Sequence, residues 1–229
     1  MDTWRRVPSV HHELREFADA SAVAAAAAEF VVACSRRSIE ANGRFTFAVS
    51  GGKTPWTMFE ELARMDVAWS EVIIYQVDER IAPVGDPTRN LTNLERSLGE
   101  RRPTIVAMPV NDDDLDAAAS SYARELPSRF DLVHLGLGPD GHTASLIPGD
   151  PVLEERDRLV AVTGAYQGER RMTLTYEALA HAERLLWLVT GADKRTALAA
   201  LLRGDTTIPA GGVAASDSLV MADRAAMAT

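Results

Sequence analysis

Three short segments of the chain carry side chains that could do chemistry together. They are SGGKTP at residues 50–55, DER at residues 78–80 and GLGPDGHT at residues 136–143. Glycine-rich loops can turn several backbone N–H groups toward an anion, and a histidine can take up or release a proton near neutral pH. The three segments therefore predict an anion site beside a group capable of acid–base catalysis.

The third segment places a carboxylate and an imidazole two residues apart. Asp140 could hold His142 in one tautomer, which a general base requires. The alternative is that His142 caps a following helix or satisfies a buried carbonyl. The glycines of the segment also match the dinucleotide-binding spacing GxGxxG, but Pro139 and Asp140 followed by a histidine fit a catalytic turn better.

The first segment follows the strand-like sequence RFTFAV and is expected to bind a phosphate. Ser50, Gly51 and Gly52 offer successive backbone N–H groups at the start of a helix. Lys53 could add a positive charge, and Thr54 belongs to the same candidate site. The segment is not a Walker loop, because it lacks the spacing GxxxxGKS or GxxxxGKT.

Two further pairs of basic residues could reach a phosphate. Arg170-Arg171 precedes MTLT, and Lys194-Arg195 follows a glycine. We take Arg171 and Lys194 as the candidates, because both could make charge-assisted hydrogen bonds to a phosphate. Either pair could equally be solvated charge at the end of a helix.

The DER segment has three interpretations. Asp78, Glu79 and Arg80 could position a water, bind sugar hydroxyls or form an ordinary surface ion pair. The local sequence by itself favours the ion pair.

These segments need a scaffold, and the sequence alternates between strand and helix patterns. Strands are predicted at residues 44–49, 71–77, 105–108, 131–135, 159–162, 171–175 and 184–189, and helices at 21–39, from 55, at 91–98, 112–126 and 192–202. Residues 78–88 are predicted as a loop. The alternation is typical of a Rossmann-like α/β fold, a largely parallel sheet with helices on both faces, here as a single domain over residues 1–229. Since ligands bind at the carboxyl ends of such strands, the three segments should meet in one crevice.

Composition limits the partners. The net charge of -9 disfavours nucleic acid and anionic membranes, and no apolar run approaches a membrane span. A single cysteine, Cys34, fits a reducing compartment, so we expect a cytoplasmic protein, a monomer or a weak homodimer. The histidines show no metal-ligand spacing, and His11, His12, His134 and His181 are assigned no role.

Taken in order, SGGKTP, VDERIAP with Asn90 ten residues beyond Arg80, GLGPDGHTASLIPG, RMTLT and GADK resemble the 6-phosphogluconolactonase family over roughly residues 45–215. The resemblance implies a Rossmann-like fold and the hydrolysis of 6-phospho-D-glucono-1,5-lactone, a sugar-phosphate lactone of the pentose phosphate pathway. It implies no required cofactor and no metal.

The resemblance also implies roles for the candidate residues. His142 would be the general base and Asp140 its neighbouring carboxylate. Arg80 would stabilise the oxyanion and, with Asp78, line the sugar side of the crevice, and Asn90 would be among the residues that bind the substrate or its phosphate. The phosphate would be held by Gly51, Gly52, Arg171 and Lys194. Two departures concern this phosphate side: YQGERRMTLT replaces a proline-rich KPPxxR lead-in, and Lys53 stands where Ser or Arg is familiar.

Two alternatives stay open. Glucosamine-6-phosphate deaminases resemble this family, but they typically show DEY where this chain has DER, and a glutamate soon after the histidine where it has TASL. A non-catalytic regulator that binds sugar phosphates is the second. The joint presence of Asp140, His142 and Arg80 counts against it.

Overall fold

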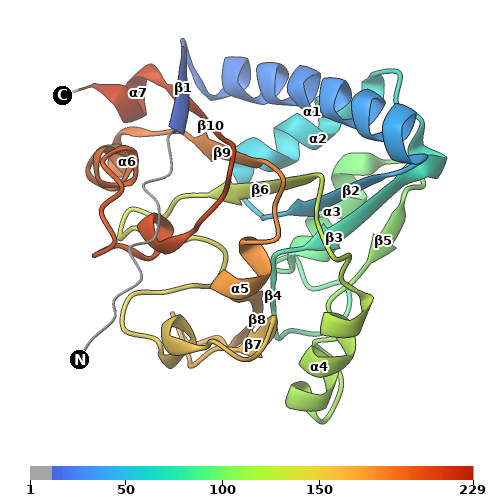
Figure 1. The fold of residues 1–229 in the computed structure, drawn as a ribbon, viewed down its shortest axis with the longest axis vertical. Coiled ribbons are helices and arrows are strands. Elements are labelled where there is room, and N and C mark those ends of the chain that lie inside the picture. Colours follow the sequence, from blue (N-terminus) through green and yellow to red (C-terminus); the bar gives the residue numbers. More distant parts are fainter. Residues whose placement is uncertain (1–11, 229) are drawn as a thin grey trace.

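The computed structural model describes residues 12–228, which form a large parallel sheet and a small antiparallel one (Figure 1). All neighbouring strands of the large sheet run parallel. In spatial order they are β1 (His12–Phe17), β10 (Ser218–Asp223), β9 (Leu185–Val189), β6 (Leu132–Gly136), β2 (Phe45–Val49), β3 (Val72–Gln76) and β5 (Thr104–Val106).

The central strands are mostly apolar because both faces of the sheet are covered. Every residue of β2 (FTFAV) and β9 (LLWLV) is buried. Continuous apolar runs of this kind are typical of parallel strands between two layers of helices. The predicted fold class, a largely parallel sheet with helices on both faces, is therefore confirmed.

Helices pack on the two faces of the sheet in separate hydrophobic clusters. One face is covered by α1 (Ala20–Asn42), α2 (Lys53–Arg64) and α3 (Asn90–Leu98). The other is covered by α4 (Leu115–Glu125), α5 (Tyr176–Leu179), α6 (Arg195–Leu202) and α7 (Arg224–Met227). Short 3-10 helices lie at η1 (Trp69–Glu71), η2 (Pro151–Glu154), η3 (Ala192–Lys194) and η4 (Pro209–Gly212).

The alanine-rich helix α1 shows how local sequence sets an element. The side chain of Asp19 accepts a hydrogen bond from the Ala22 amide and so caps the first turn. The helix ends at Gly43, whose φ of 73° permits its N–H to donate to the Ile39 carbonyl. Small side chains let α1 approach the sheet closely.

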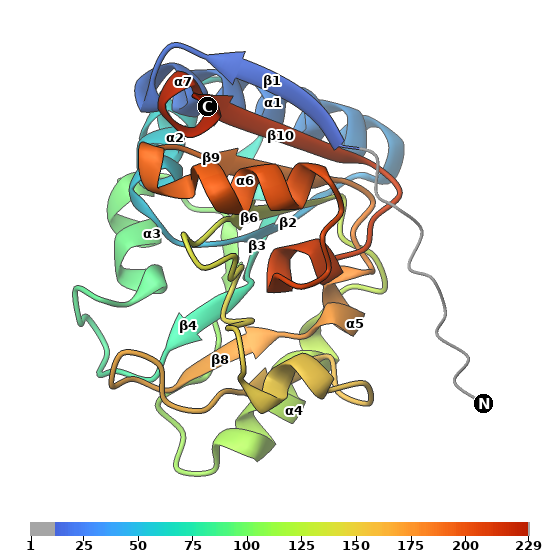
Figure 2. The ribbon, with the colours of Figure 1, turned by 90° about the vertical axis from the view of Figure 1, so that its left-hand side faces the viewer.

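The small sheet differs from the sequence prediction. Residues 78–88 were expected to be a loop, but they begin with β4 (Asp78–Arg80), which pairs antiparallel with β8 (Arg171–Leu174). β8 pairs in turn with β7 (Val160–Val162). The predicted strands at 159–162 and 171–175 thus exist, but they lie outside the parallel sheet, and Figure 2 shows β4 and β8 side by side below it.

Two strands escaped the prediction altogether. β1 and β10 were not expected as strands, yet β10 is fully buried and β1 lies at the sheet edge. The sequence of β1, HELREF, is polar because most of its residues face solvent, so it carries no apolar run to recognise.

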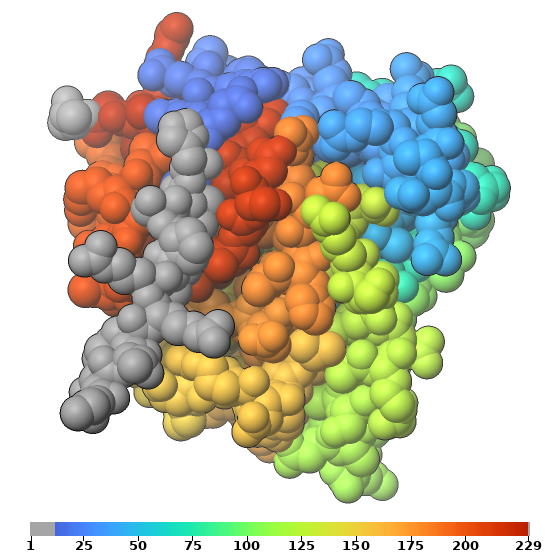
Figure 3. All heavy atoms as spheres, in the orientation of Figure 1, coloured from blue at the N-terminus to red at the C-terminus, as the bar shows by residue number. Residues whose placement is uncertain are grey.

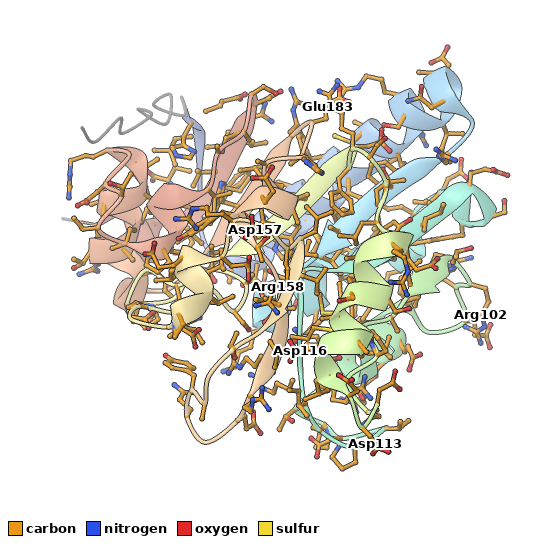
Figure 4. The ribbon with its side chains drawn as sticks, turned by 60° about the horizontal axis from the view of Figure 1, so that its bottom comes forward. Arg102, Asp113, Asp116, Asp157, Arg158 and Glu183 are labelled. Atoms are coloured by element: carbon orange, nitrogen blue, oxygen red, sulfur yellow. The ribbon has the colours of Figure 1, made fainter. Side chains whose placement is uncertain are left out.

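The small sheet contacts α4 through β7 and through a residue that precedes β7. Arg158, just before β7, forms an ion pair with Asp116 of α4 at 3.2 Å, and Figure 4 shows the two side chains facing each other. In the space-filling view, the segments around residues 150–185 fill the space between α4 and the C-terminal segment (Figure 3). The small sheet thus forms a wall beside the carboxyl ends of the main strands.

Candidate active site

Neighbouring parallel strands end at one cavity of about 850 Å³. Its wall includes Ser50 after β2, Asp78 after β3, Gly136 at the end of β6 and Thr190 after β9. Open α/β sheets usually bind ligands at this edge. The three segments that were expected to share a crevice therefore line a single cavity.

The predicted site residues lie together with one exception. All of them line the cavity apart from Asp140. Asp140 instead hydrogen bonds to His142, which does line it.

The glycine-rich loop opens helix α2 earlier than predicted. The helix begins at Lys53 rather than at Pro55, so Gly52 is its N-cap, with a φ of 138° that favours glycine. Gly51 needs to be glycine for a different reason, since a Cβ there would lie 2.0 Å from Oδ1 of Asn90. Backbone N–H groups at a helix start, free of side-chain bulk, form a suitable cradle for an anion.

Two of the cations expected to hold the phosphate come from separate pairs of basic residues. Arg171 and Lys194 line the cavity, whereas the adjacent Arg170 and Arg195 donate to backbone carbonyls elsewhere. Arg171 is only 7% exposed, and its Nε has no hydrogen-bond partner among residues 12–228. Nζ of Lys194 lies 3.2 Å from the carboxylate of Asp193. Both side chains therefore bring positive charge to the cavity wall.

Asp140 and His142 form a closely bonded pair. Nδ1 of His142 lies 2.5 Å from Oδ1 of Asp140, which also accepts the His142 backbone N–H at 3.1 Å. Partial burial opposes ionisation of Asp140, but the bonds from His142 outweigh it and lower the pKa of this carboxyl. With Nδ1 engaged, Nε2 is the ring nitrogen free to act on a substrate. The next helical element starts at Pro151, so His142 does not cap a following helix.

The loop that carries this pair admits no side chain at Gly138. A Cβ there would lie 2.1 Å from Nδ1 of His142 and 2.6 Å from Oδ1 of Asp140. Ala144, also on the cavity wall, has a φ of 49°, which is uncommon for a residue other than glycine. The backbone here is shaped around the imidazole.

The three DER side chains have different surroundings. Asp78 and Glu79 are buried, while Arg80 reaches the carboxylate of Glu169 at 3.1 Å and the carbonyl of Thr88 at 2.5 Å. The surface ion pair that the local sequence favoured is therefore wrong for Glu79, whose side chain is fully buried. The reason is that residues 78–80 form β4, a strand of the small sheet that pairs with β8 and contacts α3.

Glu79 organises the start of helix α3. Its carboxylate accepts hydrogen bonds from the backbone N–H groups of Asn90 and Leu91 at 2.7 and 2.8 Å. It also accepts from Nε2 of Gln76 at 2.9 Å and lies 3.4 Å from Nε of the buried Arg89. A carboxylate at a helix start satisfies free N–H groups and the helix dipole together.

Asp78 presents a buried carboxyl to the cavity. Oδ2 accepts from the Ser145 hydroxyl at 2.6 Å, and Oδ1 accepts from Nδ2 of Asn90 at 3.1 Å. Burial raises the pKa of Asp78, although the Ser145 hydrogen bond and the Arg171 charge act in the opposite direction. This carboxyl is thus more easily protonated than an ordinary aspartate.

Sequence reasoning missed three residues that support the site. Glu79 was considered only as part of DER, His134 was given no role, and Tyr166 was not singled out. Nδ1 of His134 accepts the Ser50 N–H at 3.2 Å, and the Tyr166 hydroxyl donates to Asp140 at 3.2 Å. The available signal for His134 was a histidine within the otherwise apolar strand DLVHL.

Within residues 12–228, no group of three or more His, Cys, Asp or Glu side chains is arranged to hold a metal ion. None of the helices in that range is both long and apolar enough to cross a bilayer.

Comparisons with known proteins agree on one family. The family model described as glucosamine-6-phosphate isomerases/6-phosphogluconolactonase matches residues 18–221. A 6-phosphogluconolactonase of Mesorhizobium japonicum is 38% identical over 193 residues, covering 79% of this chain and 81% of the relative. One from Nostoc sp. is 33% identical over 195 residues, with the same coverage of both chains. The crystal structure of a 6-phosphogluconolactonase from Thermotoga maritima superposes with a TM-score of 0.83 at 26% identity, covering 92% of this chain and 99% of the other.

Proposed function

The chain belongs to the family of glucosamine-6-phosphate isomerases and 6-phosphogluconolactonases, and from this premise we propose how it hydrolyses 6-phospho-D-glucono-1,5-lactone to 6-phosphogluconate. The reaction is a step of the pentose phosphate pathway. In this proposal His142 is the general base, and the phosphate is held by other residues that line the same cavity.

The reaction proceeds in two steps. Nε2 of His142 removes a proton from a water as its oxygen forms a bond to C1 of the lactone. Backbone N–H groups and Arg80 stabilise the negative charge that develops on the carbonyl oxygen. The bond between C1 and the ring oxygen then breaks, and the proton held by His142 passes to that oxygen. The products are a carboxylic acid, which ionises, and a free hydroxyl.

The phosphate is bound by charges that oppose the net charge of the protein. The N–H groups of Gly51 and Gly52, with Lys53 nearby, would donate hydrogen bonds to its oxygens at the start of α2. Arg171 and Lys194, which line the cavity, would add charge-assisted hydrogen bonds. Asp78 and Asn90, which line the same cavity, would bind sugar hydroxyls.

One observation carries this proposal. The anion cradle and the His142 imidazole line the same cavity, so one substrate can be anchored at its phosphate while its ester carbon meets the base. Positioning of this kind supplies much of the rate increase in many enzymes. Because a lactone is already reactive, a general base that contributes about 10² to 10⁴-fold is sufficient.

Replacement of the base tests the mechanism. His142→Ala should lower kcat by at least about 10²-fold in a stopped-flow assay of acid release, corrected for spontaneous hydrolysis. His181→Ala removes a histidine that does not line the cavity and is the matched control. A His142→Ala enzyme with nearly unchanged kcat would remove His142 from this role.

The alternative functions predict different products. A glucosamine-6-phosphate deaminase would release ammonia from glucosamine 6-phosphate, and this chain should release none. A regulator would bind 6-phosphogluconate without accelerating lactone hydrolysis. Both assays use the same protein preparation.

The remaining features of the proposal concern the protein as a whole. We propose that residues 1–229 act as a single domain, in the cytoplasm, as a monomer or weak homodimer, and without a cofactor. The lone, buried Cys34 supports a reducing compartment. Light scattering at increasing protein concentration would measure the oligomeric state.

A further inference from the structure

A tight hairpin between β7 and β8 lies beside the dyad of Asp140 and His142. Tyr166 and Glu169 exchange backbone hydrogen bonds at 2.9 and 3.2 Å across the turn. The two residues between them, Gln167 and Gly168, have φ angles of 53° and 83°. Two consecutive positive φ values are typical of a type I′ turn, which joins strands with little freedom.

Tyr166 contacts three polar residues of the site at once. Its hydroxyl donates to Oδ2 of Asp140 at 3.2 Å. Its ring meets the His142 imidazole edge-on, with centroids 5.8 Å apart. The guanidinium carbon of Arg171 lies 5.4 Å from the ring centroid, within the range of a cation–π interaction.

The Tyr166 hydroxyl donates to the carboxylate oxygen of Asp140 that His142 does not contact. Both hydrogen bonds from His142 go to Oδ1, so Oδ2 is held by Tyr166. Together the contacts fix the rotation of the carboxylate and therefore the plane of the imidazole bonded to it. Burial and the nearby Asp140 raise the pKa of the Tyr166 hydroxyl, so it stays protonated and donates at neutral pH.

The hairpin is held at its other end as well. Glu169 pairs with Nε of Arg80 at 3.1 Å. One short turn therefore contacts the base and both arginines that line the cavity among residues 12–228.

We propose that Tyr166 is a positioning residue of the lactonase reaction: its hydroxyl fixes the Asp140–His142 dyad, and its ring seats Arg171. The inference rests on the proposed function. It assigns a purpose to the YQGERR segment, where the chain departs from the family's proline-rich sequence. Tyr166 itself does not touch the reacting atoms.

Two substitutions separate the contributions of the hydroxyl and the ring. Tyr166→Phe keeps the ring over Arg171 but loses the bond to Asp140. Its kcat should fall about 3- to 10-fold, the effect of one hydrogen bond, while KM stays within about twofold. Tyr166→Leu loses both contacts, so the same fall in kcat should be joined by a rise in KM of about 2- to 5-fold.

Tyr176→Phe is the matched control. It also removes one hydroxyl, which donates to the Pro209 carbonyl at 2.9 Å, and Tyr176 does not line the cavity. Its kcat and KM should equal those of the unmodified protein, even if Tm falls.

The possible results decide between the two roles. An unchanged kcat in Tyr166→Phe overturns the inference. A fall in kcat that is accompanied by an equally large rise in KM and a lower Tm also overturns it, because that pattern indicates a merely structural role. Lactone hydrolysis by the unmodified protein is measured first. Its absence would count against the proposed function and would be seen before any variant is compared.

Discussion

The backbone N–H of Ser50 donates a hydrogen bond to Nδ1 of His134, 3.2 Å away, and so joins the end of β2 to the interior of β6. The imidazole is fully buried, and its Nε2 has no hydrogen-bond partner within residues 12–228. Because Nδ1 accepts, the ring proton lies on Nε2. The first residue of the anion loop is thus held by a neutral histidine in the sheet.

This arrangement predicts a loss of stability in mild acid. Burial lowers the pKa of His134 to about 3, whereas an unfolded histidine titrates near pH 6.5. Between these values the unfolded chain binds a proton that the folded chain does not, so the free energy of unfolding falls as pH falls. From pH 6.5 to pH 5, His134 should contribute a loss of about 2 kcal/mol, measured by urea unfolding.

His134→Asn isolates this contribution, since the asparagine oxygen can still accept the Ser50 N–H but does not titrate. Its loss of stability over the same interval should be smaller by about 2 kcal/mol. His181→Asn, at a partly exposed position, is the control. The buried Asp78 has a raised pKa and acts with the opposite sign, equally in all three proteins. Equal pH dependence in His134→Asn and the unmodified protein would contradict the assignment.

The main elements of the fold could be predicted from the sequence because their apolar patterns are strong. Runs such as RFTFAV and DLVHL indicate strands, and the alternation with helices indicates the parallel sheet. β4 was missed because its sequence, DER, has no apolar residue: its burial comes from tertiary contacts with β8 and α3. β1 was missed because most of its residues are exposed at the sheet edge, so HELREF has no continuous apolar run.

The candidate site was predictable where one motif carries both partners, and not where a contact joins distant segments. Asp140 and His142 are two residues apart, so their pairing could be expected. Tyr166 meets Asp140 from a hairpin 26 residues later, and Ser50 meets His134 across 84 residues. Only the topology of the sheet and the turn after β7 brings such pairs together.

Gly138 should be intolerant of any side chain. In Gly138→Ala the new Cβ would overlap Nδ1 of His142 and displace the imidazole from Asp140. We expect a fall in kcat of about 10²-fold, approaching that of His142→Ala, with near-native circular dichroism. Gly136→Ala is the comparison, since its Cβ would meet nothing within 4 Å, and it should lose far less activity. Similar losses in the two variants would show that steric overlap with His142 is not the cause.

Arg171 and Lys194 should act on substrate affinity more than on turnover. Arg171→Met or Lys194→Met removes a charge-assisted hydrogen bond to the phosphate and should raise KM about 10- to 100-fold. Inhibition by 6-phosphogluconate should weaken in parallel, which is measured in the same assay. Arg195→Met is the control, because Arg195 donates to the Ala225 carbonyl instead. A large fall in kcat at unchanged KM would place these cations at the reacting carbonyl rather than at the phosphate.

Replacement of Glu79 should affect the stability of the fold more directly than it affects catalysis. Glu79→Gln keeps the shape of the side chain but replaces one acceptor oxygen by a donor, so a backbone N–H at the start of α3 loses its partner and the buried Arg89 loses its counter-charge. Losing one partner of a buried ion pair typically costs about 3 kcal/mol or more, measured as the free energy of unfolding in urea. Glu61→Gln removes an exposed pairing with Arg64 and should cost little. Helix α3 also begins with Asn90, which hydrogen bonds to Asp78, so the folded fraction of Glu79→Gln should show a raised KM as well. Equal stability of Glu79→Gln and Glu61→Gln would mean that Glu79 does not hold α3 in place.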